Sequence, residues 1–492
     1  MNACTKEILV ITFIIFIVNL VFRLITQTEA GIWYDEAFSI FHSQKELFLI
    51  KNVSTWDIAP PFYYYVLHYW MLVFGIGEHE VRMLGIMCIC LSVSILFLFS
   101  YRFFNLEIAL FTTILFSTSN EIFYFSQEAR AYSLLVLLSV VSSFLFFQLL
   151  IKPKWFLLIA LGVINWAGIY THYFFLFVPA IQCSVALVCF NKRVISFMFL
   201  SVILTIAIFG KWLHRIYEVF TQGNTSQSNP ILKSYDFLIL IKSLAGESVM
   251  FYILVPLSVV GLLFLIKTGF KNFKSEKLIQ VLYVLLIAFF PITALYFFSH
   301  GMGGVFTPRY ILFSLPSIVL FISYLLSKIN WGTKLKPTLM ILLLVVGVYT
   351  INYRFEKFTD YKKAIPVVVK NKTENTLVIV QSSVMYQLFS YYFDKNIFKD
   401  YKNTELLLKE KNIIFKEDSS SINPQTSLGF NKVILLQSFE NGCDPQASIK
   451  KYLELRFKNT EVFNNFLQAK LTIYTNPYND PVIGFKNRIE NL

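Results

Sequence analysis

The chain has 492 residues, of which 56% are hydrophobic and only 15% are charged, and its formal net charge is +13. Soluble domains are roughly 45–50% apolar and about 25% charged, so this composition excludes an ordinary soluble protein. It also excludes a disordered chain, because 52 Phe and 27 Tyr supply ample apolar surface for burial. The composition therefore indicates an integral membrane protein that crosses the bilayer several times.

Apolar runs of about 17–25 residues, long enough to cross a bilayer, recur over residues 1–351. The first, Ile8–Phe22, is followed by Arg23 and has no small-residue cleavage site, so we expect a retained span rather than a cleaved signal peptide. About eleven transmembrane helices are expected, at residues 8–25, 82–101, 106–122, 131–151, 155–170, 173–190, 194–212, 248–266, 278–298, 310–327 and 337–351.

Basic residues set the expected orientation of these spans. Short loops on one side carry many Lys and Arg residues, such as Lys152, Lys154, Lys192 and Arg193, so the positive-inside rule places the N-terminus in the cytoplasm. An odd number of spans then places the C-terminal region outside.

Histidines and acidic residues gather on the opposite side of the membrane. All 6 histidines, and most acidic residues before position 351, fall in or beside outer-facing segments. The long loops 26–81 and 213–247 face the same way. Chemistry is therefore expected at the outer face, with the alternative that long loops collect polar residues without any catalytic role.

The first outer loop contains two adjacent carboxylates, Asp35 and Glu36, within the sequence Trp-Tyr-Asp-Glu-Ala. If Asp35 begins a helix, its carboxylate can stabilise the helix N-terminus. The functional alternative is that one carboxylate is a general base and the other orients it or binds substrate hydroxyls.

Further along this loop, the paired Pro60 and Pro61 are expected to start an aromatic helix at the membrane interface. Glu80 and Arg82 follow at the start of the second span. Arg82 could neutralise a phosphate or pair with a neighbouring glutamate.

Three short outer segments add polar groups near the membrane surface. Glu128 and Arg130 lie in one tight turn, where the planar fork of Arg130 could bind a phosphate or form a plain ion pair. His172 lies alone in a second turn. Arg309 and Tyr310 follow a glycine-rich loop, as a phosphate clamp or gate or as an interfacial anchor.

Residues 352–492 carry no spanning run. Short β-type runs at Thr376–Gln381, Lys432–Gln437 and Lys470–Tyr474 alternate with helix-like stretches near 360–371, 383–393 and 446–457. This alternation predicts a small soluble α/β domain on the outer, periplasmic face. No glycine-rich phosphate loop or metal-ligand spacing is present, so nucleotide binding is not expected and a donor must arrive through the membrane.

Six of these segments, in this order, resemble the bacterial members of glycosyltransferase family 39, relatives of the protein O-mannosyltransferases and of the lipid A aminoarabinose transferase. The shared segments are Tyr34–Ala37, Pro60–Tyr64, Glu80–Arg82, Ser126–Tyr132, Thr171–Tyr173 and Pro308–Tyr310. The resemblance covers most of residues 8–330. It implies a polytopic α-helical membrane protein of the GT-C type, with a catalytic domain over 1–351 and an extracytoplasmic α/β domain over 352–492.

The resemblance also implies a polyprenyl-phosphate-linked sugar donor and a role for Asp35 as base or catalytic carboxylate, beside Glu36. Glu128 and Arg130 would line the same cavity. Many relatives have a basic residue before the two prolines, where this chain has Ala59, and a Pro-Trp pair where it has Lys211-Trp212. The donor phosphate must then be met by other cations. The expected donor and substrate residues are Arg130, Glu128, Arg309, Arg82, Tyr310, His172 and Lys211.

The sequence therefore predicts a bacterial inner-membrane glycosyltransferase that moves a sugar from a polyprenyl phosphate to an acceptor hydroxyl at the periplasmic face. The expected acceptor is a lipid, a polysaccharide or a protein, and no nucleic acid is expected to take part. No cofactor is expected to be required, although some related folds use a divalent cation at the first-loop acid. The alternatives are a transporter or flippase of lipid-linked sugars, which would favour internal repeats and broken helices, and a polysaccharide polymerase or ligase.

Overall fold

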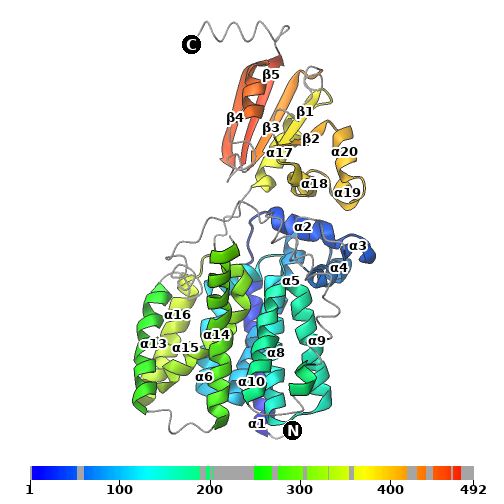
Figure 1. The fold of residues 1–492 in the computed structure, drawn as a ribbon. Coiled ribbons are helices and arrows are strands. Elements are labelled where there is room, and N and C mark those ends of the chain that lie inside the picture. The colour runs from blue at the N-terminus through cyan, green and yellow to red at the C-terminus, as the bar shows by residue number, and fades with distance from the viewer. Residues whose placement is uncertain are drawn as a thin grey trace. The chain divides into compact units, whose positions relative to one another are not determined.

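The computed structural model describes residues 3–51, 60–188, 195–199, 203, 249–268, 275–302, 307–330, 332–353, 360–417, 429–438, 447–466 and 469–477. Contacts divide the chain into two compact units (Figure 1). Unit 1 is Met1–Thr28 with Phe48–Tyr353, and unit 2 is Glu29–Leu47 with Arg354–Leu492.

Unit 1 is helical throughout its described residues. Its elements are α1 (Ala3–Ile25), α3 (Leu47–Ile50, which begins on the last residue of unit 2), α4 (Phe62–Phe74), α5 (Glu78–Phe103), α6 (Leu106–Ser117), α7 (Asn120–Ser126), α8 (Tyr132–Ile151), α9 (Trp155–Thr171), η1 (Tyr173–Leu176), α10 (Phe177–Val188), α13 (Val249–Thr268), α14 (Ser275–Met302), η3 (Pro308–Ser314), α15 (Leu315–Lys328) and α16 (Gly332–Thr350).

The long apolar helices of unit 1 confirm a polytopic membrane protein. Among the described residues, six helices are long and apolar enough to cross a membrane, or seven if the bent pair of α6 and α7 is one span. Two shorter apolar helices follow, at Trp155–Thr171 and Tyr173–Val188. The described parts of ten predicted spans fall on helical segments, although residues 106–122 divide between α6 and α7. Most of the remaining span, 194–212, lies outside the described residues.

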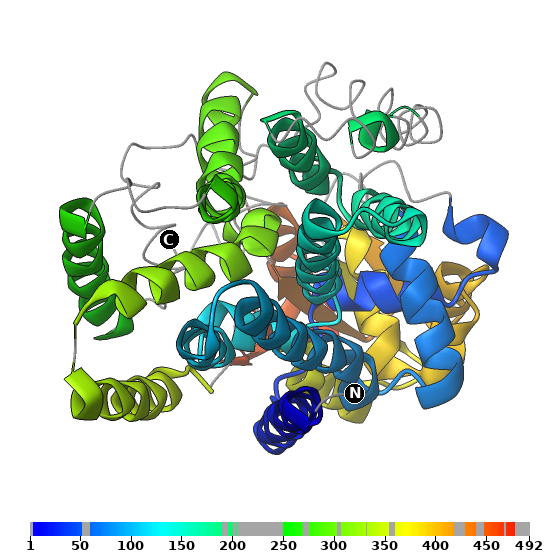
Figure 2. The ribbon, with the colours of Figure 1, turned by 90° about the horizontal axis from the view of Figure 1, so that it is seen from below.

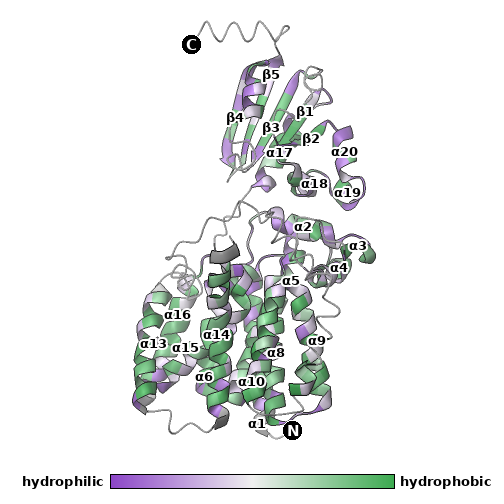
Figure 3. Cartoon of the chain, in the orientation of Figure 1, coloured by the Kyte–Doolittle hydropathy of each residue, from purple (hydrophilic) through white to green (hydrophobic). Residues whose placement is uncertain are grey.

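The surfaces and contacts of these helices fit a lipid environment. Large apolar side chains such as Val18, Leu263 and Phe297 are exposed, and the helices are predominantly hydrophobic along their length (Figure 3). In the view of Figure 2, α5 packs against α1, α6 and α8. In hydrocarbon, helices satisfy their own backbone hydrogen bonds. Apolar side chains that face lipid are not in contact with water, so their exposure carries no hydrophobic penalty.

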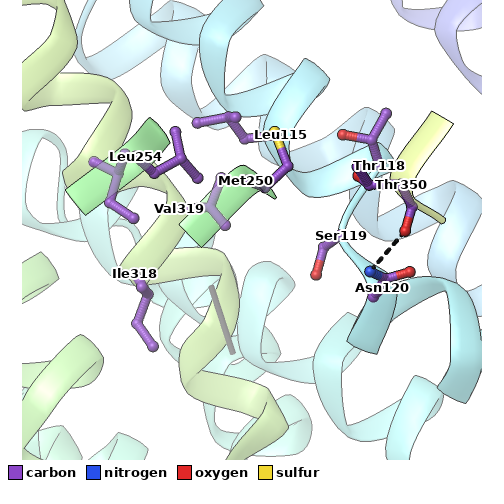
Figure 4. Close-up of a pocket in the computed structure, with 10 residues that line it drawn as sticks. Leu115, Thr118, Ser119, Asn120, Met250, Leu254, Ile318, Val319 and Thr350 are labelled. Carbon is purple, nitrogen blue, oxygen red and sulfur yellow. Dashed lines mark hydrogen bonds between the residues drawn. The ribbon is translucent and has the colours of Figure 1, made fainter. Parts of the chain in front are cut away.

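The chain bends by 58° between α6 and α7. The break frees backbone groups that other helices then satisfy, since Arg23 of α1 donates to Ser117 O (3.1 Å). Asn120 donates from Nδ2 to Thr350 O (3.1 Å) and accepts from Asn352 N (2.8 Å), which ties α7 to the end of α16. A pocket at this bend has hydroxyl and amide groups at one end and apolar side chains at the other (Figure 4).

A closed ring of hydrogen bonds joins three helices inside unit 1. Ser142 Oγ of α8 donates to Asn165 Oδ1 of α9 (2.6 Å), Asn165 Nδ2 donates to Gln182 Oε1 of α10 (2.8 Å), and Gln182 Nε2 donates to Ser142 Oγ (2.7 Å). Ser143 Oγ and Tyr283 Oη of α14 lie 2.9 Å apart. All five side chains are buried. The ring and the Ser143–Tyr283 contact together fix how the four helices meet.

The C-terminal part of unit 2 is an α/β domain with a five-stranded sheet of order β2-β1-β3-β5-β4. The strands are β1 (Thr376–Gln381), β2 (Ile413–Lys416), β3 (Lys432–Ser438), β4 (Phe457–Phe466) and β5 (Ala469–Pro477). β1 is parallel to β2 and β3, while β5 is antiparallel to β3 and β4. The helical elements are α17 (Tyr361–Asn371), η4 (Ser383–Met385), α18 (Tyr386–Phe393), α19 (Lys395–Lys399), α20 (Thr404–Glu410) and α23 (Ser448–Glu454).

The sequence correctly predicted β1, β3 and β5 and the three helical stretches, but it missed β2 and β4. β2 has only four residues. β4 is an edge strand whose side chains are mostly exposed and polar, so it carries no apolar run. Leu377, Ile379, Val433 and Leu435 from the two central strands form a core with α23.

The first outer loop is divided between the two units. Its residues Glu29–Leu47 belong to unit 2 with Arg354–Leu492, and they contain α2 (Tyr34–Ser43). α2 packs on α18. No local sequence pattern predicts this pairing, because the two segments are far apart along the chain.

We expect Ser142→Ala to lower the stability of the folded protein, because Asn165 and Gln182 would each lose a buried partner. The cost should be about 1 kcal/mol, typical of interhelical hydrogen bonds. Thermal unfolding in detergent, followed by intrinsic fluorescence, measures it. Ser184→Ala is the matched control, since the exposed Ser184 hydroxyl bonds only Ala180 O of its own helix. Equal midpoints for the two variants would contradict a stabilising role for the ring.

Candidate functional site

The two first-loop carboxylates lie in the first turn of α2 and have different environments. Trp33 has extended backbone and caps the helix, so Asp35 is the second helical residue and Glu36 the third. Glu36 Oε2 accepts a hydrogen bond from Trp33 N at 3.4 Å, as in a capping box. Glu36 is 0% exposed, whereas Asp35 is partly exposed.

This geometry divides the roles that the sequence left open for the pair. The capping hydrogen bond considered for Asp35 is made by Glu36, whose carboxylate accepts from the backbone N–H of the N-cap residue Trp33. Asp35 contributes its backbone carbonyl, which accepts from Ser39 Oγ at 2.9 Å. Its carboxylate lies at the helix N-terminus, where the backbone dipole favours the anion. Asp35 is therefore the more exposed member of the pair.

The turn that carries Glu128 and Arg130 lies in unit 1 between α7 and α8. Arg130 N donates to Glu128 O at 2.8 Å, which makes the turn tight. Gln127 anchors it to the end of α1, because its Oε1 accepts from Thr28 N (2.6 Å) and its Nε2 donates to Thr26 O (3.1 Å). Glu128 is buried and Arg130 is half-buried.

α5 packs directly against this turn at Gly85. A Cβ atom at Gly85 would lie 2.8 Å from Ser126 O and 3.2 Å from Glu128 O, so the turn rests directly on the helix backbone. Arg82 is on the same helix, three residues earlier, and is 0% exposed. Gly85 is a site residue that the sequence did not single out, and its signal was a lone glycine inside an apolar run.

An aromatic cluster brings three of the predicted segments together within unit 1. The His172 ring lies 5.2 Å from that of Tyr310 and 6.5 Å from that of Tyr132, between ring centroids. The Arg309 guanidinium is 5.3 Å from the centroid of the Tyr310 ring. Tyr132 follows Arg130 by two residues, so the Arg130 turn, His172 and the Arg309 segment are neighbours.

His172 has a structural part in this cluster. Its Nδ1 accepts from Phe174 N at 3.4 Å, and the side chain is buried. The imidazole therefore holds the turn between α9 and η1 and stacks on its aromatic neighbours.

The predicted site residues thus fall into two sets. Asp35 and Glu36 belong to unit 2, while Arg82, Glu128, Arg130, His172, Arg309 and Tyr310 belong to unit 1. Lys211, Ala59, Gly303 and Gly304 lie outside the described residues. In the part of the chain that is described, no group of three or more His, Cys, Asp or Glu could hold a metal ion.

The segment after α2 is anchored by charge. Lys402 Nζ and Tyr401 Oη both donate to Glu46 Oε1, at 2.8 and 3.1 Å. These hydrogen bonds, that from Lys402 first, lower the pKa of Glu46, and the same contact raises the pKa of Lys402. Both side chains are largely exposed.

Comparisons with known proteins support the fold and not the sequence family. No protein-family model matches the chain, and no curated protein matches its sequence. The fold is similar to ArnT from Cupriavidus metallidurans bound to undecaprenyl phosphate, with 10% identity, a TM-score of 0.57 and coverage of 96% of this chain and 98% of that one. The apo form of ArnT gives 12% identity and a TM-score of 0.60 over the same coverage.

A third solved structure has the same architecture. It is the apo oligosaccharyltransferase from Archaeoglobus fulgidus, with 9% identity, a TM-score of 0.52 and coverage of 88% of this chain and 70% of that one. Both neighbours have the GT-C fold. The predicted fold class is therefore confirmed, as a polytopic helical membrane protein of GT-C type with a C-terminal α/β domain.

We expect acid to loosen the segment after α2. Because the folded-state pKa of Glu46 is depressed, its stabilising contribution is fully present above the ordinary value of 4.5 and is lost as the pH falls below it. Hydrogen exchange of residues 44–50, corrected for the intrinsic rate at each pH, should increase between about pH 5 and pH 3. The Glu46→Gln variant is the control and should lack this component. An identical pH profile in the two proteins would show that the contacts of Glu46 with Lys402 and Tyr401 do not stabilise this segment.

Proposed function

We propose that this protein is a glycosyltransferase that moves a sugar from a polyprenyl-phosphate carrier to an acceptor hydroxyl. The observation that carries the proposal is the likeness of fold over nearly the whole chain to ArnT, a protein crystallised with undecaprenyl phosphate. The partly exposed carboxylate of Asp35 and the cations around the Arg130 turn supply the groups that such a transfer needs.

In the proposed reaction, Asp35 accepts the proton of the acceptor hydroxyl as that oxygen attacks the anomeric carbon of the donor. A new glycosidic C–O bond forms while the bond from the anomeric carbon to the phosphate oxygen breaks. The electron pair of the broken bond leaves with the polyprenyl phosphate. The products are the glycosylated acceptor, a protonated Asp35 and the free lipid phosphate.

Negative charge develops on the phosphate as it leaves, so cations aimed at it stabilise the transition state. Arg130 and Arg309 are the side chains we assign to this task, because both are partly exposed and both flank the aromatic cluster. Arg82 of α5 and Glu128 of the turn itself are buried, and we assign both to the support of the turn. Lys211 stays a candidate from the sequence alone.

We propose a bacterial plasma membrane as the location, with Asp35 and the C-terminal domain on the outer side, on the basis of the basic residues in the short loops. The acceptor is a lipid, a polysaccharide or a protein hydroxyl. Guanidinium groups can neutralise the leaving phosphate, so the proposed reaction does not require a divalent cation. Activity that persists in excess EDTA would support this, and strict dependence on added metal would contradict it.

We expect Asp35→Asn to lower the rate of sugar transfer by about 10²- to 10⁴-fold, the usual contribution of a general base. The assay uses purified protein in detergent with radiolabelled polyprenyl-phosphate sugar. Glu410→Gln, which neutralises an exposed carboxylate of α20, is the control and should keep full activity. An active Asp35→Asn variant would remove Asp35 from the role of base. Wild-type protein that moves the lipid across vesicles but transfers no sugar would identify a transporter instead.

We expect Arg309→Ala to weaken the binding of undecaprenyl phosphate by about tenfold or more, because a charge-assisted hydrogen bond contributes about 1.5–3 kcal/mol. Titration of purified protein with the lipid measures the change. The control, Arg102→Ala, removes an exposed arginine in the last turn of α5 and should leave the affinity unaltered. Equal affinities in all three proteins would make Arg309 an interfacial anchor only.

A further inference from the structure

The backbone before α2 is fixed by two side chains of the C-terminal domain. Ile32 N donates a hydrogen bond to Tyr392 Oη of α18, and Lys362 Nζ of α17 donates to Glu29 O at 3.0 Å. Ile32 is 0% exposed, so its N–H has no access to water. These two bonds set the path of the chain as it enters α2.

Gly31 lies between these bonds, against the same two side chains. A Cβ atom at this position would lie 2.9 Å from Lys362 Cβ and 2.9 Å from Tyr392 Oη. A real Cβ almost never comes that close to another heavy atom. The entry segment therefore runs directly against α17 and α18, at a distance that only glycine permits.

The helix itself is seated by apolar packing. The Phe41 ring is 5.6 Å from the Tyr386 ring and 5.4 Å from the Phe398 ring, both edge-on. Gln44 Nε2, just after the helix, donates to Phe398 O at 2.6 Å. Phe41 and Ile40 are buried. The clamp of Glu46 by Lys402 and Tyr401 then closes the segment.

Contacts with the C-terminal domain are therefore spread over the entry, the body and the exit of α2. The helix has ten residues. Helices of this length are marginal in water by themselves, so its stability comes from tertiary packing. The contacts given above provide such packing, and they come from α17, α18, α19 and the loop after α19.

We propose that the C-terminal domain is the scaffold that positions the Asp35 carboxylate, with Tyr392 as the main positioning residue. Ile32 N is bonded three residues before Asp35, so the Tyr392 hydroxyl fixes the backbone from which the first turn of α2 starts. The domain is thus a working part of the candidate site rather than an appended module. The catalytic consequence rests on the proposed function, whereas the structural consequence does not.

The structural test is hydrogen–deuterium exchange of the full-length protein in detergent, read on peptides that cover residues 34–43. Tyr392→Phe removes only the hydroxyl and leaves the buried Ile32 N–H without its acceptor, so exchange of these peptides should rise by about fivefold or more. Tyr452→Phe, the same change in α23, should leave them as in the wild type. Unchanged exchange in Tyr392→Phe would overturn the proposal.

The functional test compares steady-state constants for sugar transfer by the same proteins. Displacement of a catalytic group by an ångström or less can lower the rate about 10²-fold, so Tyr392→Phe should lower kcat by about ten- to hundredfold while the KM for the donor stays close to the wild-type value. Phe41→Leu, which keeps an apolar contact, should show a smaller loss. Faster exchange with unchanged kcat would overturn the link to Asp35.

The two tests separate the proposals. Wild-type protein without transfer activity would count against the proposed function, and the exchange experiment would still decide whether the C-terminal domain holds α2. Transfer activity together with wild-type exchange in Tyr392→Phe would leave the function standing and reject the scaffold.

Discussion

The absence of water from the bilayer interior is the constraint on which this structure depends. Polar groups there must find partners within the protein, and the structure shows how this is achieved: the Ser142–Asn165–Gln182 ring closes on itself, and Arg23 reaches the carbonyl freed by the bend after α6. Groups that must remain reactive cannot sit in such a closed environment. The candidate residues Asp35 and Arg130 lie instead at a helix N-terminus and in a turn.

Rigid support is common to both sets of candidate residues. The Arg130 turn rests on Gly85 and is tied to α1 through Gln127. α2 rests on α18 through Phe41 and is tied at its entry by Tyr392. In each case a short segment is held by side chains from distant parts of the chain. The proposed chemistry at these partly exposed side chains therefore relies on the distant residues that hold their segments.

Much of this could be predicted from the sequence, and the failures have a common cause. Apolar runs and short motifs are local signals, so they located the spans, the strands β1, β3 and β5, and the segments that carry Asp35, Arg130 and Arg309. Pairings between distant segments leave no local pattern. The attachment of the α2 segment to Tyr392 and Lys402 was missed for that reason. The choice between Asp35 and Glu36 as the capping residue could not be made either, because it needs the start of the helix to within one residue. β4 was missed because an exposed edge strand needs few apolar residues.

The central claim is that the chain transfers a sugar from a polyprenyl-phosphate carrier, and the stoichiometry of the products tests it most directly. Purified protein would be incubated in detergent with a polyprenyl-phosphate sugar and an envelope extract as the source of acceptor, and both products would be quantified by mass spectrometry. For the proposed reaction, we expect one free polyprenyl phosphate for each sugar that becomes covalently attached to an acceptor. Attachment without release of the lipid phosphate, or no attachment of sugar to any acceptor while the donor remains intact, would contradict it.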